Sequence, residues 1–222
     1  MVSQPWNTIT TSTILPSKAP VSTGTYLMKR SNIAMPQTTV QEEASAQKSG
    51  LLTGLDVFVG GPIQHAILEK GFVGHLQDAI TTAIDTVTEH GGNIFSAHVV
   101  EKFGAETAAF TPEQVSVRDF RWMKKCDVFV PVLPVLEDQT LRRTDGTHVE
   151  LGWATALGRP IVLITKQPFV ESASHLLKGL HRVGFVQAID FEEFTEKPSL
   201  LIDAVLAATE RQREAIGASL VA

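Results

Sequence analysis

Asp119 is the first residue whose type conflicts with its surroundings in the sequence. It lies in the segment SVRDFRWMKKCD, where helical spacing places apolar residues on its side of a helix, namely Val115, Trp122 and Cys126. A carboxylate on the buried side of a helix costs free energy unless it is paired or used. Asp119 is therefore a candidate catalytic acid. The alternatives are that it reaches the rim of the helix or pairs with Arg118 or Arg121.

Glu150 is the second candidate, in the stretch DGTHVELGWATALGRP. Thr147 and Glu150 have the T-x-x-E spacing of a capping box, in which Glu150 would reach back to the amide of Thr147. Glu150 also follows the loop RRTDGTH, just beyond a predicted strand, where open α/β sheets present functional groups. A helix N-terminus favours an ionised carboxylate, which suits a nucleophile. The cap and the nucleophile are both possible interpretations.

Gly60 and Gly61, in GGPIQHA, follow another predicted strand. Glycines let the backbone approach a ligand closely and leave its amides unhindered, which is useful around a phosphate or a ribose. The alternative is an ordinary turn from a strand into a helix. The motif is not G-x-G-x-x-G, so a dinucleotide site has little support.

Several other kinds of chemistry lack their motifs. The seven histidines are scattered without an H-x-x-x-H pair or a cysteine partner, which argues against a metal site. Only His98 and His148 are expected near the cleft. The sequence has no G-x-S-x-G and no Walker loop, which argues against serine hydrolases and kinases.

Strands and helices alternate from Leu55 onward and would position these residues. Apolar runs predict five strands, at 55–61, 93–98, 127–134, 160–165 and 183–189. Helical spacing predicts helices at 72–91, 112–125, 148–158 and 198–220. This alternation predicts an α/β fold with a doubly wound, five-stranded, mostly parallel sheet (Rossmann/flavodoxin-like) and helices on both faces. The three features above would then meet at the carboxyl edge of the sheet.

The composition limits the domain organisation and the partners. Residues 1–50 are rich in Ser, Thr and Pro without an apolar face and predict a flexible or arm-like tail, with 51–222 as a single domain. The net charge of -5 argues against nucleic acid or an anionic membrane as a partner, and no stretch has the length of a membrane span. The single cysteine, Cys126, excludes an internal disulfide and fits the cytoplasm.

Three blocks of the sequence resemble one family. DVFVGGPI, VRDFRWMKKCDVFVPVLP and DGTHVELGWATALGRPIVLI resemble the nucleoside 2-deoxyribosyltransferase-like superfamily, and within it the N-glycosidases that hydrolyse CMP and hydroxymethyl-CMP in nucleoside-antibiotic pathways. The resemblance implies that Glu150 is the nucleophile and Asp119 the helical aspartate that serves the leaving base. It assigns substrate contacts to the loops, with the phosphate at Thr144, Gly146 and Thr147, the sugar-phosphate at Gly60 and Gly61, and the base at Pro62, Ile63 and Gln64.

The resemblance also implies a reaction. Glu150 would form a covalent ribosyl ester, which water resolves to free base and ribose 5-phosphate, with no cofactor. A homodimer is implied, because the family completes its sites across subunits. The alternatives are base exchange by a 2-deoxyribosyltransferase and a catalytically silent nucleotide-sensing module.

Two departures from the family pattern bear on specificity. The only tyrosine, Tyr26, lies in the tail, so the family's tyrosine beside the glutamate is unfilled, which favours the ribonucleotide branch. Ile63 and Gln64 replace the Phe-Arg of the CMP hydrolases, which leaves the base open.

Overall fold

Alternating apolar and polar segments produce a parallel sheet wrapped by helices. The structure, a computed structural model, describes residues 50–69 and 71–219. Its main sheet consists of β1 (Asp56–Gly60), β4 (Asn93–Phe95), β5 (Val128–Leu133), β6 (Ile161–Thr165) and β7 (Val186–Ile189). Its α-helices are α1 (Gly74–Glu89), α2 (Ala97–Val100), α3 (Pro112–Lys125), α4 (Asp145–Ala156), α5 (His175–Gly179), α6 (Phe191–Glu196) and α7 (Leu200–Ser219). The predicted tail at 1–50, with Tyr26, lies outside the described residues apart from Gly50.

The strand order confirms the predicted fold class. The five strands run in the order β4-β1-β5-β6-β7, and every neighbouring pair is parallel. This is the flavodoxin-like order, in which the connection changes direction between the first and the third strand of the sheet. Here that switch point lies between β1 and β5, and ligands of such sheets bind beside it.

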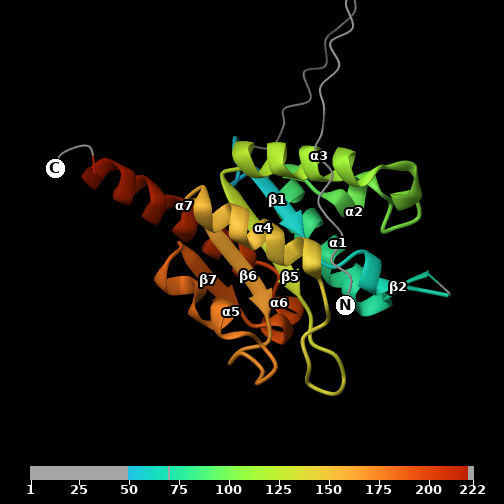
Figure 1. The fold of residues 1–222 in the computed structure, drawn as a ribbon. Helices are drawn as coiled ribbons and strands as arrows, with labels where there is room; N and C mark the ends of the chain where they lie inside the picture. The colour runs from blue at the N-terminus through green and yellow to red at the C-terminus, as the bar shows by residue number, and fades with distance from the viewer. Residues whose placement is uncertain (1–49, 70, 220–222) are drawn as a thin grey trace, which may run out of the picture. The chain divides into compact units, whose positions relative to one another are not determined.

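Successive side chains of each strand point to opposite faces of the sheet and pack in two separate hydrophobic cores. On one face, Val57 and Val59 of β1 pack with the buried sides of α1, α6 and α7. On the other face, Phe58 packs with residues of α3, α4 and α5. Figure 1 shows α3 and α4 together over that second face, with α4 crossing β5 and β6. The helices that carry Asp119 and Glu150 are therefore neighbours on one layer.

The start of α4 corrects one sequence prediction. The helix begins at Asp145, after Thr144 at the N-cap, so Thr147 and Glu150 already lie inside it. The proposed capping box of Thr147 and Glu150 is therefore wrong, because the helix starts before the T-x-x-E pattern does. A complete capping box is instead found at α3, between Thr111 and Gln114. Glu150 is free of a capping role.

A small hairpin was not predicted from the sequence. Strands β2 (Ile67–Leu68) and β3 (Gly71–Phe72) pair antiparallel beside the short 3-10 helix η1 (Gln64–Ala66). Phe72 therefore belongs to β3, and α1 begins two residues later than the sequence predicted. Two further 3-10 helices are η2 (Thr107–Ala109) and η3 (Leu180–Arg182). Within residues 50–69 and 71–219, no helix combines the length and the apolar character needed to cross a bilayer.

Candidate active site

A cavity of about 310 Å³ opens at the carboxyl end of β1, and the segments that follow β1 and β4 line it together with α3 and the start of α4. This volume is at the lower end of the usual range for small-molecule pockets. Every predicted site residue lines it: Gly60, Gly61, Pro62, Ile63, Gln64, His98, Asp119, Thr144, Gly146, Thr147 and Glu150. The remaining walls include Phe58, Glu101, Thr107, Phe110, Pro112, Val115 and Ser116. The structure thus brings together segments that are far apart in the sequence.

Glu150 projects from the second turn of α4 against the end of β1. Its side chain is buried, at 8% exposure. A Cβ atom added to Gly60 would lie only 3.0 Å from Glu150 Oε2 and 3.0 Å from the ring of Phe129. Gly60 is therefore needed for the close approach of the carboxylate rather than for a special backbone angle.

The next residue, Gly61, is constrained in a similar way. A Cβ atom there would lie 3.2 Å from the carbonyl oxygen of Val132 and 3.2 Å from Ile80 Cδ1. Both glycines therefore lie where an added side chain would press on neighbouring atoms, and both line the cavity.

Asp119 is held by an ion pair on the opposite wall. Arg118 Nε donates to Asp119 Oδ1 at 2.7 Å, and Arg118 Nη2 donates to Glu101 Oε1 at 2.7 Å. The second oxygen of Glu101 accepts from the Thr107 hydroxyl at 2.6 Å. The pairing of Asp119 with Arg118 was one of the alternatives left open by the sequence. The structure adds that the paired carboxylate still lines the cavity.

Aromatic rings hold the guanidinium in place. Arg118 Cζ lies 4.9 Å from the centre of the Trp122 ring and 5.4 Å from that of Phe110. Such cation–π contacts stabilise a cation that is partly removed from water. The guanidinium is consequently fixed behind the cavity wall, where it holds two carboxylates that line the cavity, Asp119 and Glu101.

Glu101 was missed by sequence reasoning. It is only 2% exposed and lines the cavity, but it follows the short helix α2 in a segment without a recognisable motif. Its partner Arg118 is 17 residues further along the chain, so no local spacing connects the two. Its position three residues after His98 is the only local signal, and that signal is weak.

Burial changes the expected charge of Glu150. Burial, with the nearby negative charge of Asp119, raises the pKa of Glu150 well above its usual value, against a smaller opposing effect of Arg118. The pKa of Asp119 is also raised, because burial outweighs the hydrogen bond and charge of Arg118. The sequence had suggested that the helix N-terminus would keep Glu150 ionised. The loss of water is the larger effect, and it raises the proton affinity of both carboxyls.

The start of α4 forms another wall of the cavity. The Thr144 hydroxyl donates to the Thr147 hydroxyl at 2.6 Å, and both residues are buried. His148, expected near the cleft, instead points outward, does not line the cavity, and donates from Nδ1 to the Thr144 carbonyl at 2.7 Å. The amide end of α4 carries a partial positive charge, so this wall favours an anion.

The loop after Gly61 is tied to both neighbouring elements. Arg142 donates to the His65 carbonyl at 2.7 Å and so joins this loop to the segment before α4. His98 Nε2 lies 3.4 Å from the Pro62 carbonyl oxygen and donates to it. Burial lowers the pKa of His98 to about 4, so its ring is neutral near pH 7. Among the residues that the structure describes, no cluster of three His, Cys, Asp or Glu side chains could hold a metal ion.

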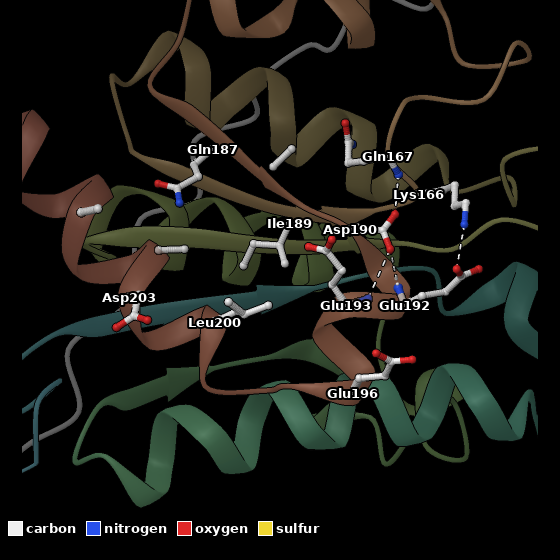
Figure 2. A pocket seen from close by; sticks show the side chains of 13 residues that line it. Lys166, Gln167, Gln187, Ile189, Asp190, Glu192, Glu193, Glu196, Leu200 and Asp203 are labelled. Carbon is white, nitrogen blue, oxygen red and sulfur yellow. Dashed lines mark hydrogen bonds and ion pairs between the residues drawn. The ribbon is translucent and has the colours of Figure 1, made fainter.

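A second hollow, of about 800 Å³, lies beside β7 and contains none of the predicted site residues. Figure 2 shows two of its acidic side chains engaged: Asp190 accepts from the amides of Gln167, Glu192 and Glu193, and Lys166 pairs with Glu192 at 2.8 Å. These bonds cap α6 and join it to the end of β6, which gives Asp190 and Glu192 a structural role. Because the predicted site residues all line the smaller cavity, that cavity is the candidate active site.

Fold and site together define a doubly wound α/β protein with paired carboxyls in a small-molecule cavity at its switch point. No protein-family model matches the sequence, and no curated protein matches it. Among solved structures, the chain is similar to BlsM, with 28% identity, a TM-score of 0.57, and coverage of 74% of this chain and 95% of BlsM. It is also similar to the CMP N-glycosidase BcmB of Clostridium botulinum, with 26% identity, a TM-score of 0.45, and coverage of 65% and 98%. The similarity to BlsM bears out the predicted resemblance at the level of this fold.

Proposed function

We propose that this protein is a nucleotide N-glycosidase that cleaves a nucleoside 5′-monophosphate, a CMP-like ribonucleotide, into free base and ribose 5-phosphate. The observation that carries the proposal is the pair of buried carboxyls, Glu150 and Asp119, which lie on neighbouring helices and line one cavity. Most glycosidases use two carboxyl groups that flank the glycosidic bond they hydrolyse.

In the proposed reaction, the Glu150 carboxylate attacks C1′ of the ribose through an oxocarbenium-like transition state. The C1′–N bond breaks, and its electron pair leaves with the base, which takes a proton from Asp119. The product is an ester between Glu150 and ribose 5-phosphate. Water then displaces Glu150 from C1′, a proton returns to the carboxyl pair, and ribose 5-phosphate leaves.

The raised pKa values of Glu150 and Asp119 support this sequence of steps. The leaving base needs one proton, which the carboxyl pair can hold because both pKa values are raised. The nucleophile needs a negative charge, which the pair carries on its other member. In the complex with substrate the proton would lie on Asp119, which leaves Glu150 as the attacking carboxylate.

The walls of the cavity support a nucleotide as the substrate. The amide end of α4 with Thr144, Gly146 and Thr147 suits the phosphate. Ile63 and Gln64 suit the base, with Gln64 able to form a bidentate amide contact. Phe110 adds an aromatic surface on which a base can stack.

The test is incubation of the protein with ribonucleotides, deoxyribonucleotides and nucleosides, with and without a second free base, followed by chromatography. We expect free base and ribose 5-phosphate from a ribonucleotide. Exchange of the base would support a transferase instead. Unchanged nucleotides in every arm would contradict an enzyme and leave a nucleotide-sensing module.

We further propose a homodimer, with the α3–α4 surface facing the second copy. Val117, Phe120 and Val149 are 49%, 37% and 50% exposed on the same two helices that carry Asp119 and Glu150. Phe120 packs edge-on against Trp153, which makes the apolar surface continuous from α3 to α4. Sedimentation equilibrium should give twice the chain mass for the wild type and one chain mass for Phe120→Glu. A wild-type monomer at micromolar concentration would contradict the proposal.

A further inference from the structure

Glu101 is a buried carboxylate that the proposed reaction does not use. Both of its oxygens are engaged, Oε1 by Arg118 Nη2 at 2.7 Å and Oε2 by the Thr107 hydroxyl at 2.6 Å. It is less exposed than either Asp119 or Glu150. A buried charge is expensive, so a carboxylate kept here calls for a reason.

The geometry of Arg118 gives a reason for a buried carboxylate at this position. The Nε and Nη2 atoms of a guanidinium form a fork that fits the two oxygens of a single carboxylate. Here the fork is divided, with Nε on Asp119 and Nη2 on Glu101. Asp119 is therefore held by one arm of the fork, although the whole guanidinium is adjacent to it.

Because Arg118 is shared between Asp119 and Glu101, the balance of charge around the cavity matters. Glu101, Asp119 and Glu150 are three carboxyls, and Arg118 is the cation that contacts two of them. Among the described residues no ion pair reaches Glu150. The other titratable groups on the cavity walls include Asp145, paired with the exposed Arg143, and His98, which is neutral near pH 7. Negative charge thus exceeds positive charge on the inner walls.

We propose that Glu101 is a positioning residue that acts through Arg118: it divides the guanidinium fork and thereby keeps a proton on the Asp119–Glu150 pair for the leaving base. The role of the proton rests on the proposed function. The division of the fork and its effect on the two carboxyls do not. Without the charge of Glu101, Arg118 closes its fork on Asp119 and holds it as a carboxylate. The negative charge of Glu101 also raises the pKa values of both Asp119 and Glu150 directly.

The experiment is a carboxyl ¹³C NMR titration of the ligand-free protein, with Asp119 and Glu150 assigned by the signals lost in Asp119→Asn and Glu150→Gln. In Glu101→Gln, which keeps the size and a hydrogen-bonding oxygen, we expect the midpoint of Asp119 to fall by about 1 pH unit. The midpoint of Glu150 should move less, because the lost charge of Glu101 lowers it while the earlier ionisation of Asp119 raises it. The matched control is Glu106→Gln, on the same segment, whose carboxylate pairs with the exposed Lys102. Its midpoints should stay at the wild-type values.

An unchanged midpoint of Asp119 in Glu101→Gln, or an equal shift in Glu106→Gln, would overturn the proposal. If Glu101→Gln does not fold, Glu101→Asp provides a second measurement. It keeps the negative charge, so the midpoint of Asp119 should stay near the wild-type value, and a midpoint that falls by about 1 pH unit in Glu101→Asp would overturn the proposal as well.

Activity gives a separate readout. With CMP as the probe, the pH profile of kcat for Glu101→Gln should move to lower pH, and Glu101→Asp should return it toward the wild type. A structural role alone would lower the rate without moving the profile, and that result would contradict the proposal. If the wild type does not cleave CMP, the proposed substrate fails while the titration still decides the role of Glu101.

Discussion

At the scale of single residues, the chemistry of the cavity depends on the removal of water from Glu150. The residue is 8% exposed, and its Oε2 lies close to the backbone of Gly60. A carboxylate in such a place has lost most of its hydration, which raises its proton affinity, and its reactivity once the proton has left. Glu150 is thus the residue on which activity should depend most strongly.

Replacement of Glu150 by Gln should therefore remove the nucleophile with little change in shape. We expect release of free base from CMP to fall by at least about 10³-fold, with CMP still bound. Base release is measured by chromatography and binding by calorimetry. Wild-type protein that is quenched with acid during turnover and then digested should yield, by mass spectrometry, the Glu150-containing peptide with ribose 5-phosphate attached. The exposed glutamate Glu137, changed to Gln, is the control. Full activity of Glu150→Gln would exclude the covalent mechanism.

Gly60 should be nearly as sensitive, although it has no side chain. In Gly60→Ala, the new Cβ would press on Glu150 Oε2 and on Phe129, each 3.0 Å away. We expect kcat/KM to fall by about 10²-fold, because displacement of a reacting group by about 1 Å has that effect. The control is Gly152→Ala on α4, where a Cβ meets nothing within 4 Å. That change should preserve activity and slightly increase the melting temperature. Equal activity of the two variants would refute the role given to Gly60.

The sequence identified the residues of the site better than their interactions. Glu150, Asp119 and the two glycines could be found because each lies at a strand end or on a helix face with a recognisable period. Glu101 could not, since its importance comes from a contact with a residue of α3 across the cavity. The charge of Glu150 was misjudged for the same reason, because burial is a property of the whole packing.

At the scale of elements, the site depends on the rotational setting of α3 and α4. Asp119 of α3 and Glu150 of α4 face one cavity because both helices pack on the same side of the sheet. Periodicity predicted these helices and all five strands, and Thr111-Pro112 correctly marked the start of α3. It missed the hairpin of β2 and β3, because strands of two residues have no period to detect. The T-x-x-E pattern misplaced the start of α4, because a local pattern does not say whether a helix has already begun.

The capping box of α3 can be tested directly. In Thr111→Ala, the amide of Gln114 loses the side-chain oxygen that it donates to. We expect the free energy of unfolding to fall by about 1 kcal/mol, measured by urea denaturation. Thr195→Ala is the control, since Thr195 is exposed and lies inside α6. A change of less than about 0.5 kcal/mol in Thr111→Ala would mean that Pro112 and packing alone define the start of α3.

At the scale of the whole molecule, two buried groups give the stability opposite dependences on pH. Burial raises the pKa of Glu150 well above 4.5, so above that pH the folded chain binds more protons than the unfolded chain, and stability falls as pH rises. Burial lowers the pKa of His98 from 6.5 to about 4, so the folded chain binds fewer protons between those values, and stability falls as pH drops through them. The site therefore lowers the stability of the fold at high pH through Glu150 and at low pH through His98.

Variants that remove each group should change one side of the stability profile. We expect Glu150→Gln to be more stable than the wild type at pH 8 by about 1 kcal/mol or more, with the difference vanishing near pH 4, because the wild type then carries the proton. His98→Phe, which keeps an aromatic ring against Phe72 and Phe103, should remove up to about 3 kcal/mol of the loss between pH 6.5 and 4. Urea denaturation across the pH range measures both, with the exposed residues Glu137 and His75 changed in parallel as controls. A Glu150→Gln protein that is less stable than the wild type at pH 8 would show that Glu150 is ionised and well paired in the folded protein, and that the chemistry does not begin from a stored proton.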